Sequence, residues 1–112
     1  MASLNKEVSE LQEKQVSSKI NGKITVASGG TKFNAGDIET KNFLIECKTK
    51  TKESKNFTIK KEWLDKINEQ SFEMGKDYSA LAFRFSPYEN KDYFVVNEKL
   101  FQEIIEIINQ QE

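Results

Sequence analysis

Apolar residues recur along this 112-residue chain with two different periods, and each period predicts one kind of element. Residues 3–20 carry them at helical spacing, in two adjoining stripes: Leu4, Val8 and Leu11, then Val16 and Ile20. We predict a helix over this segment, ended by a left-handed turn at Asn21-Gly22. The same spacing predicts a second helix from Lys60 to Met74 and a third that Asn97 caps. The apolar face of the third helix consists of Leu100, Phe101, Ile104, Ile105 and Ile108.

Shorter apolar runs, separated by turn residues, predict strands. Their approximate ranges are 23–27, 37–40, 42–47, 78–86 and 92–96. A two-residue loop, Lys41-Asn42, joins the second and third strands into a hairpin. On the fourth strand, Ala80 and Ala82 leave room for a helix to pack. The order is therefore α-β-β-β-α-β-β-α, which predicts one α/β domain over residues 1–112 with a mixed sheet between helices.

The hairpin brings charged residues together. If Thr40 pairs with Phe43, counting back along the ladder sets Asp37 opposite Glu46, with Cβ atoms about 4.5–5.5 Å apart. Two carboxylates at that separation repel each other unless a cation lies between them, and a hard divalent cation prefers such oxygen ligands. Glu46 and Lys48 are two residues apart on a strand, so their side chains share one face. The alternative is a surface hairpin with a cross-strand ion pair.

The composition excludes several kinds of chemistry. The chain has no His, which removes Ser-His and Cys-His nucleophilic catalysis and His-based metal sites. Its single Cys47 has no partner for an intramolecular disulfide or a zinc site, so a reducing cytoplasm is the expected compartment. No apolar run is long enough to span a membrane, and the N-terminus lacks the apolar segment of a signal peptide. Any catalysis is expected to rest on carboxylates, Lys, hydroxyl groups and a bound ion.

Basic residues are concentrated directly after the hairpin. The net charge is −1, but residues 48–61 contain one acid, Glu53, and six lysines: Lys48, Lys50, Lys52, Lys55, Lys60 and Lys61. A local excess of positive charge attracts phosphate groups even where the chain as a whole is nearly neutral. The alternative is an ordinary solvated loop. Arg84, the only Arg, is expected to form an ion pair within the fold.

The hairpin sequence resembles a known family. Gly36-Asp37-Ile38 followed by Glu46-Cys47-Lys48 resembles the signature of the PD-(D/E)xK nuclease superfamily, with Gly36 in place of the usual Pro. The segment from Glu13 to Lys23 is similar to the first helix of small phage-type Holliday junction resolvases. The likeness covers roughly residues 10–97 and implies a restriction-endonuclease-like core, which has the element order predicted above.

The resemblance implies a metal-dependent endonuclease. Its oxygen ligands for one or two Mg²⁺ ions, with Mn²⁺ as an alternative, would be Asp37, Glu46, Glu13 and the backbone carbonyl of Cys47. Glu7 or Glu10 takes the place of Glu13 if the register of the helix differs. Lys48 would orient or help to deprotonate the attacking water and offset charge on the phosphate.

The same resemblance implies contacts with DNA. Four lysines would hold backbone phosphates without reading sequence: Lys50, Lys52, Lys55 and Lys60. Ser28, in the Gly-rich segment 28–35, would touch a phosphate. Gln70 is the polar member of an otherwise apolar helical stripe, Trp63, Ile67 and Met74, in which Trp63 is expected to be core. Gln70 would lie near Lys48. The alternative is that its side-chain amide forms hydrogen bonds with the backbone.

A four-way junction needs two symmetric cuts, so the expected working form is a homodimer on branched or four-way DNA. Two apolar surfaces are candidate interfaces: the stripe of Leu4, Val8 and Leu11, and the last helix, whose apolar face Ile107 widens. Two other functions remain open. One is a catalytically silent DNA-binding domain of the same fold, and the other is an unrelated protein-interaction domain.

Overall fold

The computed structural model describes residues 2–25 and 37–111, and within them the chain forms three helices and five strands. In chain order they are α1 (Ala2–Ile20), β1 (Lys23–Ile24), β2 (Ile38–Glu39), β3 (Phe43–Thr49), α2 (Lys61–Glu73), β4 (Tyr78–Arg84), β5 (Tyr93–Val95) and α3 (Glu98–Gln110). This is the predicted order, and the predicted α/β class is confirmed. The Gly-rich segment that contains Ser28 lies outside the described residues. None of the described helices is both long and apolar enough to cross a membrane.

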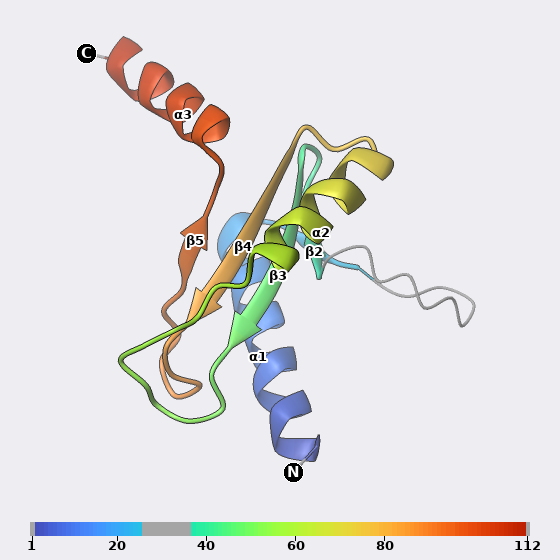
Figure 1. The fold of residues 1–112 in the computed structure, drawn as a ribbon, viewed down its shortest axis with the longest axis vertical. Coiled ribbons are helices and arrows are strands. Elements are labelled where there is room, and N and C mark those ends of the chain that lie inside the picture. The colour runs from blue at the N-terminus through green and yellow to red at the C-terminus, as the bar shows by residue number, and fades with distance from the viewer. Residues whose placement is uncertain (1, 26–36, 112) are drawn as a thin grey trace.

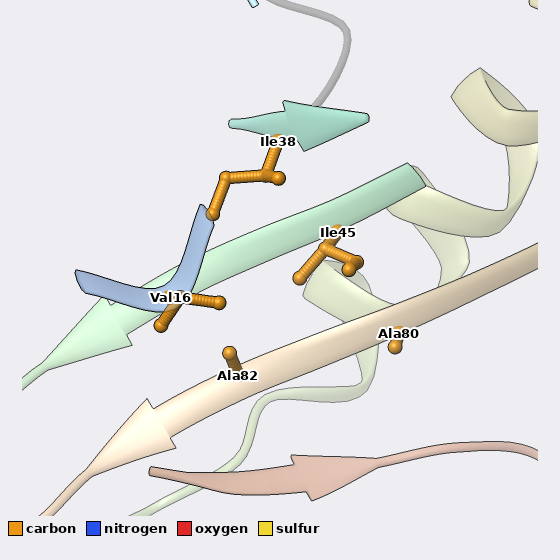
Figure 2. Close-up of a cluster of buried hydrophobic side chains, with 5 residues drawn as sticks. All are labelled: Val16, Ile38, Ile45, Ala80 and Ala82. Carbon is orange, nitrogen blue, oxygen red and sulfur yellow. The ribbon is translucent and has the colours of Figure 1, made fainter. Parts of the chain in front are cut away.

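The described strands form one mixed sheet in the order β1-β2-β3-β4-β5. β1, β2 and β3 are antiparallel neighbours, β3 and β4 run parallel, and β5 returns antiparallel to β4. α2 makes the crossover between the two parallel strands, because parallel neighbours cannot be joined by a tight turn. α1 and α2 cover opposite faces of the sheet (Figure 1 and Figure 2). Each residue of β3 therefore faces one helix or the other.

A hydrophobic core lies between α1 and the sheet. Figure 2 shows its buried members, which are Val16 from α1, Ile38 from β2, Ile45 from β3, and Ala80 and Ala82 from β4. Val16, Ile38 and Ala82 have no exposed surface. Because the alanine side chains are small, the helix can approach the sheet closely. The packing role expected for Ala80 and Ala82 is confirmed.

The stripe predicted on α2 is only partly right. Ile67 is buried, as expected, but Met74 is 37% exposed. The chain is already leaving the helix there, since Gly75 adopts a positive φ of 71°. Ser71 is buried instead, and its hydroxyl donates to the carbonyl of Tyr78 at 3.0 Å. The hydrogen bond satisfies this polar side chain, so its burial costs little.

α1 ends at the predicted turn. Asn21 has a positive φ of 53°, and the N–H of Gly22 donates to the carbonyl of Ser17 at 2.8 Å. Gly22 is also required for space, because a Cβ atom there would lie 2.6 Å from Cγ2 of Ile38. The missing side chain lets the end of α1 lie directly against β2.

Candidate active site

Asp37 lies just before β2 and is held by hydrogen bonds to both neighbouring strands. Its backbone N–H donates to the carbonyl of Ile45 at 2.9 Å, and its own carbonyl accepts from the N–H of Thr25 at 2.9 Å. Its carboxylate Oδ2 accepts from the backbone N–H of Cys47 at 2.7 Å. The side chain is therefore directed toward β3, where the other candidate residues lie.

The hairpin has the predicted register. Ile38 pairs with Ile45, and continuing the ladder by one residue sets Asp37 level with Glu46. Burial, then the charge of Asp37 and a hydrogen bond with its carboxyl group, raise the pKa of Glu46 to about 7. Near neutral pH and without a cation, the carboxyl group of Glu46 therefore carries a proton for part of the time.

α1 brings a further acid toward this pair. Burial and then the charges of Asp37 and Glu10 raise the pKa of Glu13 to about 7. Glu7 and Glu10 are exposed, and Glu10 lies 4.0 Å from Nζ of Lys6. The helix therefore presents Glu13 to Asp37, which is the register expected from the sequence. The role of Glu13 as a metal ligand stays a prediction.

Lys48 shares a face of β3 with Glu46, as strand alternation predicts. Its Nζ lies 3.9 Å from Oε2 of Glu46 and 4.5 Å from the centre of the Trp63 ring. The assignment of Trp63 to the core is therefore only partly right, since this residue is half-buried and its ring forms a wall beside Lys48. The electron-rich face of an indole attracts an ammonium group, so the ring helps to orient the lysine.

A pocket of about 290 Å³ lies between β3 and α2. Its lining consists of Glu46, Lys48, Glu62, Trp63, Lys66, Ile67 and Gln70. Gln70 lines the same pocket as Lys48, and its contact with DNA stays a prediction. Lys66 is a site residue that the sequence analysis missed, although it follows Trp63 by three residues and precedes Gln70 by four, which places all three on one side of a helix. The positive charges of Lys48 and Lys66 both act to lower the pKa of Glu46.

The four lysines predicted to contact DNA lie beside aromatic rings or in the loop before α2: Lys50, Lys52, Lys55 and Lys60. Nζ of Lys60 is 5.6 Å from the centre of the Trp63 ring, and Nζ of Lys50 is 5.8 Å from that of Phe57. Lys52 and Lys55 are exposed. The positive charge therefore extends from the pocket along its aromatic side, while the phosphate contacts themselves stay a prediction.

A buried polar network ties α1 to the sheet next to the site. Arg84 and Asp92, whose side chains are each 1% exposed, form two hydrogen bonds of 2.9 Å and 2.6 Å, so the ion pair expected of Arg84 is confirmed. Gln12 is fully buried and donates to Oδ1 of Asp92 at 3.0 Å and to the carbonyl of Lys48 at 2.9 Å. Burial by itself raises the pKa of Asp92, but hydrogen bonds from Arg84 and Gln12 hold it below its usual value.

Cys47 faces away from the pocket. Its side chain packs against the core cluster under α1, on the opposite side of β3 from Glu46 and Lys48. Burial and then the charge of Asp37 raise the pKa of its thiol, so the reactive thiolate is not formed near neutral pH. The contribution of Cys47 to the site is through its backbone. Its N–H binds Asp37, and the part of its carbonyl in metal binding stays a prediction.

Among the residues that the structure describes, no group of three or more His, Cys, Asp or Glu side chains is arranged so that it could hold a metal ion. The oxygen donors that do adjoin are those of Asp37 and Glu46, with Glu13 interacting with Asp37 from α1. Carboxylate oxygens are ligands that hard divalent cations prefer, and such a cation would have to displace the proton of Glu46 near neutral pH. The binding of Mg²⁺ by Asp37, Glu46 and Glu13 stays a prediction.

Comparison of the chain with protein-family models, with curated proteins and with solved structures found no match. The resemblance to PD-(D/E)xK nucleases therefore rests on the residues of this chain and on their arrangement. The site itself combines a carboxyl pair, a lysine on the same strand face as Glu46, and a pocket with a second lysine and an amide.

Proposed function

We propose that this chain is a metal-dependent endonuclease that hydrolyses phosphodiester bonds in DNA, with branched or four-way junctions as its substrates. The observation that carries the proposal lies on β3, where Glu46 adjoins Asp37 and shares a strand face with Lys48. Glu46 and Lys48 line one pocket, so an acid and a base meet whatever enters it. The element order is also that of a restriction-endonuclease-like core, which supports the same function.

The carboxyl pair is suited to hold a divalent cation. Asp37 and Glu46 would be its ligands, with Glu13 as the third acid and the carbonyl of Cys47 as a further oxygen. A bound Mg²⁺ would supply a water of lowered pKa and neutralise charge at the attacked phosphorus. Because the pKa of Glu46 is about 7, a cation must displace a proton from the pair below that pH. Metal affinity is therefore expected to rise with pH up to neutrality.

Lysine side chains supply the remaining charge. Lys48 is held between Glu46 and the Trp63 ring, so its ammonium group is positioned to donate hydrogen bonds to a phosphate oxygen or to the attacking water. Lys66 places a second cation in the same pocket from α2. A phosphate that enters the pocket thus meets two ammonium groups, which offset the negative charge that develops on it.

The DNA backbone would continue past the pocket along its aromatic side. Lys60 and Lys50 lie there over aromatic rings, and the exposed Lys52 and Lys55 follow in the loop. Contacts of this kind hold the phosphate backbone and carry no sequence information. Selection among DNAs would then depend on their shape, which agrees with a preference for junctions.

A cleavage assay tests the proposal. Linear duplex, nicked duplex and four-way junction DNA are incubated with the protein and Mg²⁺, Mn²⁺ or EDTA. We expect cleavage with either metal, none with EDTA, and a loss of at least about a hundredfold for Asp37→Asn and Glu46→Gln, which each remove an anionic ligand. Glu53→Gln is the matched control, because this acid is exposed in the basic segment away from the carboxyl pair. No cleavage of any DNA with either metal, or full activity of Asp37→Asn, would overturn the assignment.

A DNA-binding domain without cleavage is the second candidate. It is favoured by the finding that, within the described part of the chain, three acids are not gathered into one metal-binding group. This function predicts junction binding at low salt that is independent of metal, and calorimetry that detects no Mn²⁺ binding. If the unmodified protein binds Mn²⁺ and the Glu46→Gln variant does not, the result favours the metal-dependent nuclease over the DNA-binding domain.

A further inference from the structure

α3 is an amphipathic helix whose apolar face the other described residues leave largely uncovered. Figure 1 shows it projecting from the end of β5, away from the sheet. Its first turn is anchored, since Oδ1 of Asn97 accepts from the N–H of Leu100 at 2.9 Å and Leu100 is buried. Tyr78 also donates a hydrogen bond to Glu103.

The apolar arc of α3 is too wide for one packing partner. At about 100° per residue it covers about 160° of the helix surface, and its members are Leu100, Phe101, Ile104, Ile105, Ile107 and Ile108. Phe101 is 55% exposed, and Ile107 and Ile108 are each 56% exposed. A helix that keeps such an arc in water is expected to have a partner on that side.

A groove of about 500 Å³ adjoins this arc. It runs between the end of α1 at Ile20, the start of β3 at Phe43, Phe94 of β5, and Ile104 of α3. Phe94 is itself 45% exposed. Lys41 is part of the lining, and most of the remaining lining is apolar. Leu100 and Ile104 belong to both the groove and the arc, so the two surfaces adjoin.

We propose that this groove receives α3 of a second copy of the chain, so that the two helices pack across a twofold axis. A second copy is favoured as the occupant because the same helix supplies both parts of the contact. Ile104 lines the groove while Phe101 and Ile108 present the uncovered arc, so the surface is complementary to itself. A self-complementary patch is what a twofold dimer interface requires.

Charge and area agree with this occupant. The polar side of α3 carries Glu98, Glu103 and Glu106 against the single Lys99, and the lining of the groove contributes the opposite charge of Lys41. If a fully exposed large apolar residue offers about 200 Å², the exposed apolar residues of the arc, together with Phe94, present on the order of 500 Å² per copy. This is more than half of the about 800 Å² per partner of a standard interface.

Sedimentation equilibrium at micromolar concentration tests the interface, independently of nuclease activity. We expect a mass of twice 12.9 kDa for the unmodified chain. Phe101→Glu on the arc and Phe94→Glu in the groove should each raise the dissociation constant at least about tenfold, as for large residues at the centre of an interface. Phe72→Glu is the matched control, because Phe72 is 85% exposed on α2 and should leave the dimer intact.

Circular dichroism would show that each variant keeps its helix content, and Ile107→Glu replaces Phe101→Glu if that variant does not fold. A monomer at every concentration would overturn the proposal and indicate that α3 closes over its own groove. A dimer that withstands the arc variant would overturn it as well, because a different surface must then hold the copies together. A dimer that the arc variant dissociates but Phe94→Glu does not would reject the groove as the receptor.

Discussion

Glu46 and Glu13 each hold a proton more tightly in the folded chain than in the unfolded one. Burial, with Asp37 as the next cause, raises both pKa values from 4.5 to about 7. A group whose pKa is raised on folding contributes stability that is present below its unfolded pKa and is lost as the pH rises through its folded pKa. The free energy of unfolding of the metal-free protein should therefore fall between pH 4.5 and pH 7. Urea denaturation over this range measures it.

Variants and metal separate this effect from other titrations. Glu46→Gln should flatten the pH dependence, whereas Glu53→Gln, at an exposed position, should leave it unchanged. Mg²⁺ added above neutral pH should restore stability, because it binds the ionised pair in the folded state. A metal-free protein that is most stable at alkaline pH would contradict the raised pKa values of Glu46 and Glu13.

Lys48 is expected to act in the chemical step and not in metal binding. Lys48→Ala should lower kcat on junction DNA by at least about a hundredfold, the usual range for a group that assists proton transfer or stabilises charge. Its affinity for Mn²⁺, measured by calorimetry, should stay near that of the unmodified protein, since an ammonium group is no ligand. Lys52→Ala is the control, because Lys52 is exposed in the loop and should affect DNA affinity alone. Equal behaviour of the two variants would remove the catalytic role from Lys48.

The two ion pairs of Asp92 and Asp65 should differ strongly in their effect on stability. Asp92→Asn leaves the guanidinium of Arg84, which is 1% exposed, without its counter-charge, and should cost about 3–5 kcal/mol. Asp65→Asn breaks a pair with Lys61 in which both side chains are more than half exposed, and should cost at most about 0.5 kcal/mol. Urea unfolding of both variants makes the comparison. Similar losses would mean that the buried network is not what holds α1 to the sheet.

At the scale of elements, the parts that local geometry determines could be predicted from the sequence. The two-residue loop Lys41-Asn42 fixes the hairpin register, so the positions of Asp37 and Glu46 followed from counting. The face of Lys48 followed from strand alternation in the same way. These relations involve neighbours along the ladder and need no knowledge of the rest of the fold.

Parts that depend on distant contacts were missed. Gln12 is buried because its amide meets acceptors 36 and 80 residues away, and no periodicity in α1 indicates a polar residue with such partners. Met74 continues the helical stripe in sequence but lies where the chain turns out of α2. Trp63 is a large, mainly apolar residue of the kind usually found in a core. Only the position of Lys48 shows that its ring faces a pocket.

The junction of α1 with β2 offers a test of element packing. Gly22→Ala would set a methyl group 2.6 Å from Cγ2 of the buried Ile38, so the helix end and the strand must move apart. We expect a loss of about 1–3 kcal/mol, the usual cost of overpacking. Lys23→Ala, at the next and exposed position, should be nearly neutral. The measurement is urea unfolding of both variants. If Gly22→Ala were neutral too, the close packing of the end of α1 against β2 would be wrong.

At the scale of the whole molecule, the sequence predicted the third helix and its apolar face but not its direction. Asn97 and the spacing of Leu100 and Ile104 define where the helix begins and which side is apolar. They do not determine whether that side folds back on the sheet or projects, because both arrangements satisfy the same pattern. The projection leaves an acidic helix at one end of the molecule and the lysines of residues 48–61 beside the pocket.

This separation of charge leads to a prediction about DNA binding. Because the chain as a whole carries a net charge of −1, any affinity for DNA must come from local positive charge, and each lysine that contacts a phosphate should contribute about one unit to the slope of log affinity against log salt. Combining Lys50→Ala, Lys52→Ala and Lys55→Ala should then lower the slope by about three units, measured by fluorescence anisotropy with junction DNA in EDTA. Lys99→Ala removes one exposed lysine from α3 and so changes the net charge by as much as each of the three loop variants does. It should nevertheless leave the slope unchanged. If Lys99 changed the slope as much as each of the three, binding would follow net charge, and the path of DNA along the aromatic side of the pocket would be wrong.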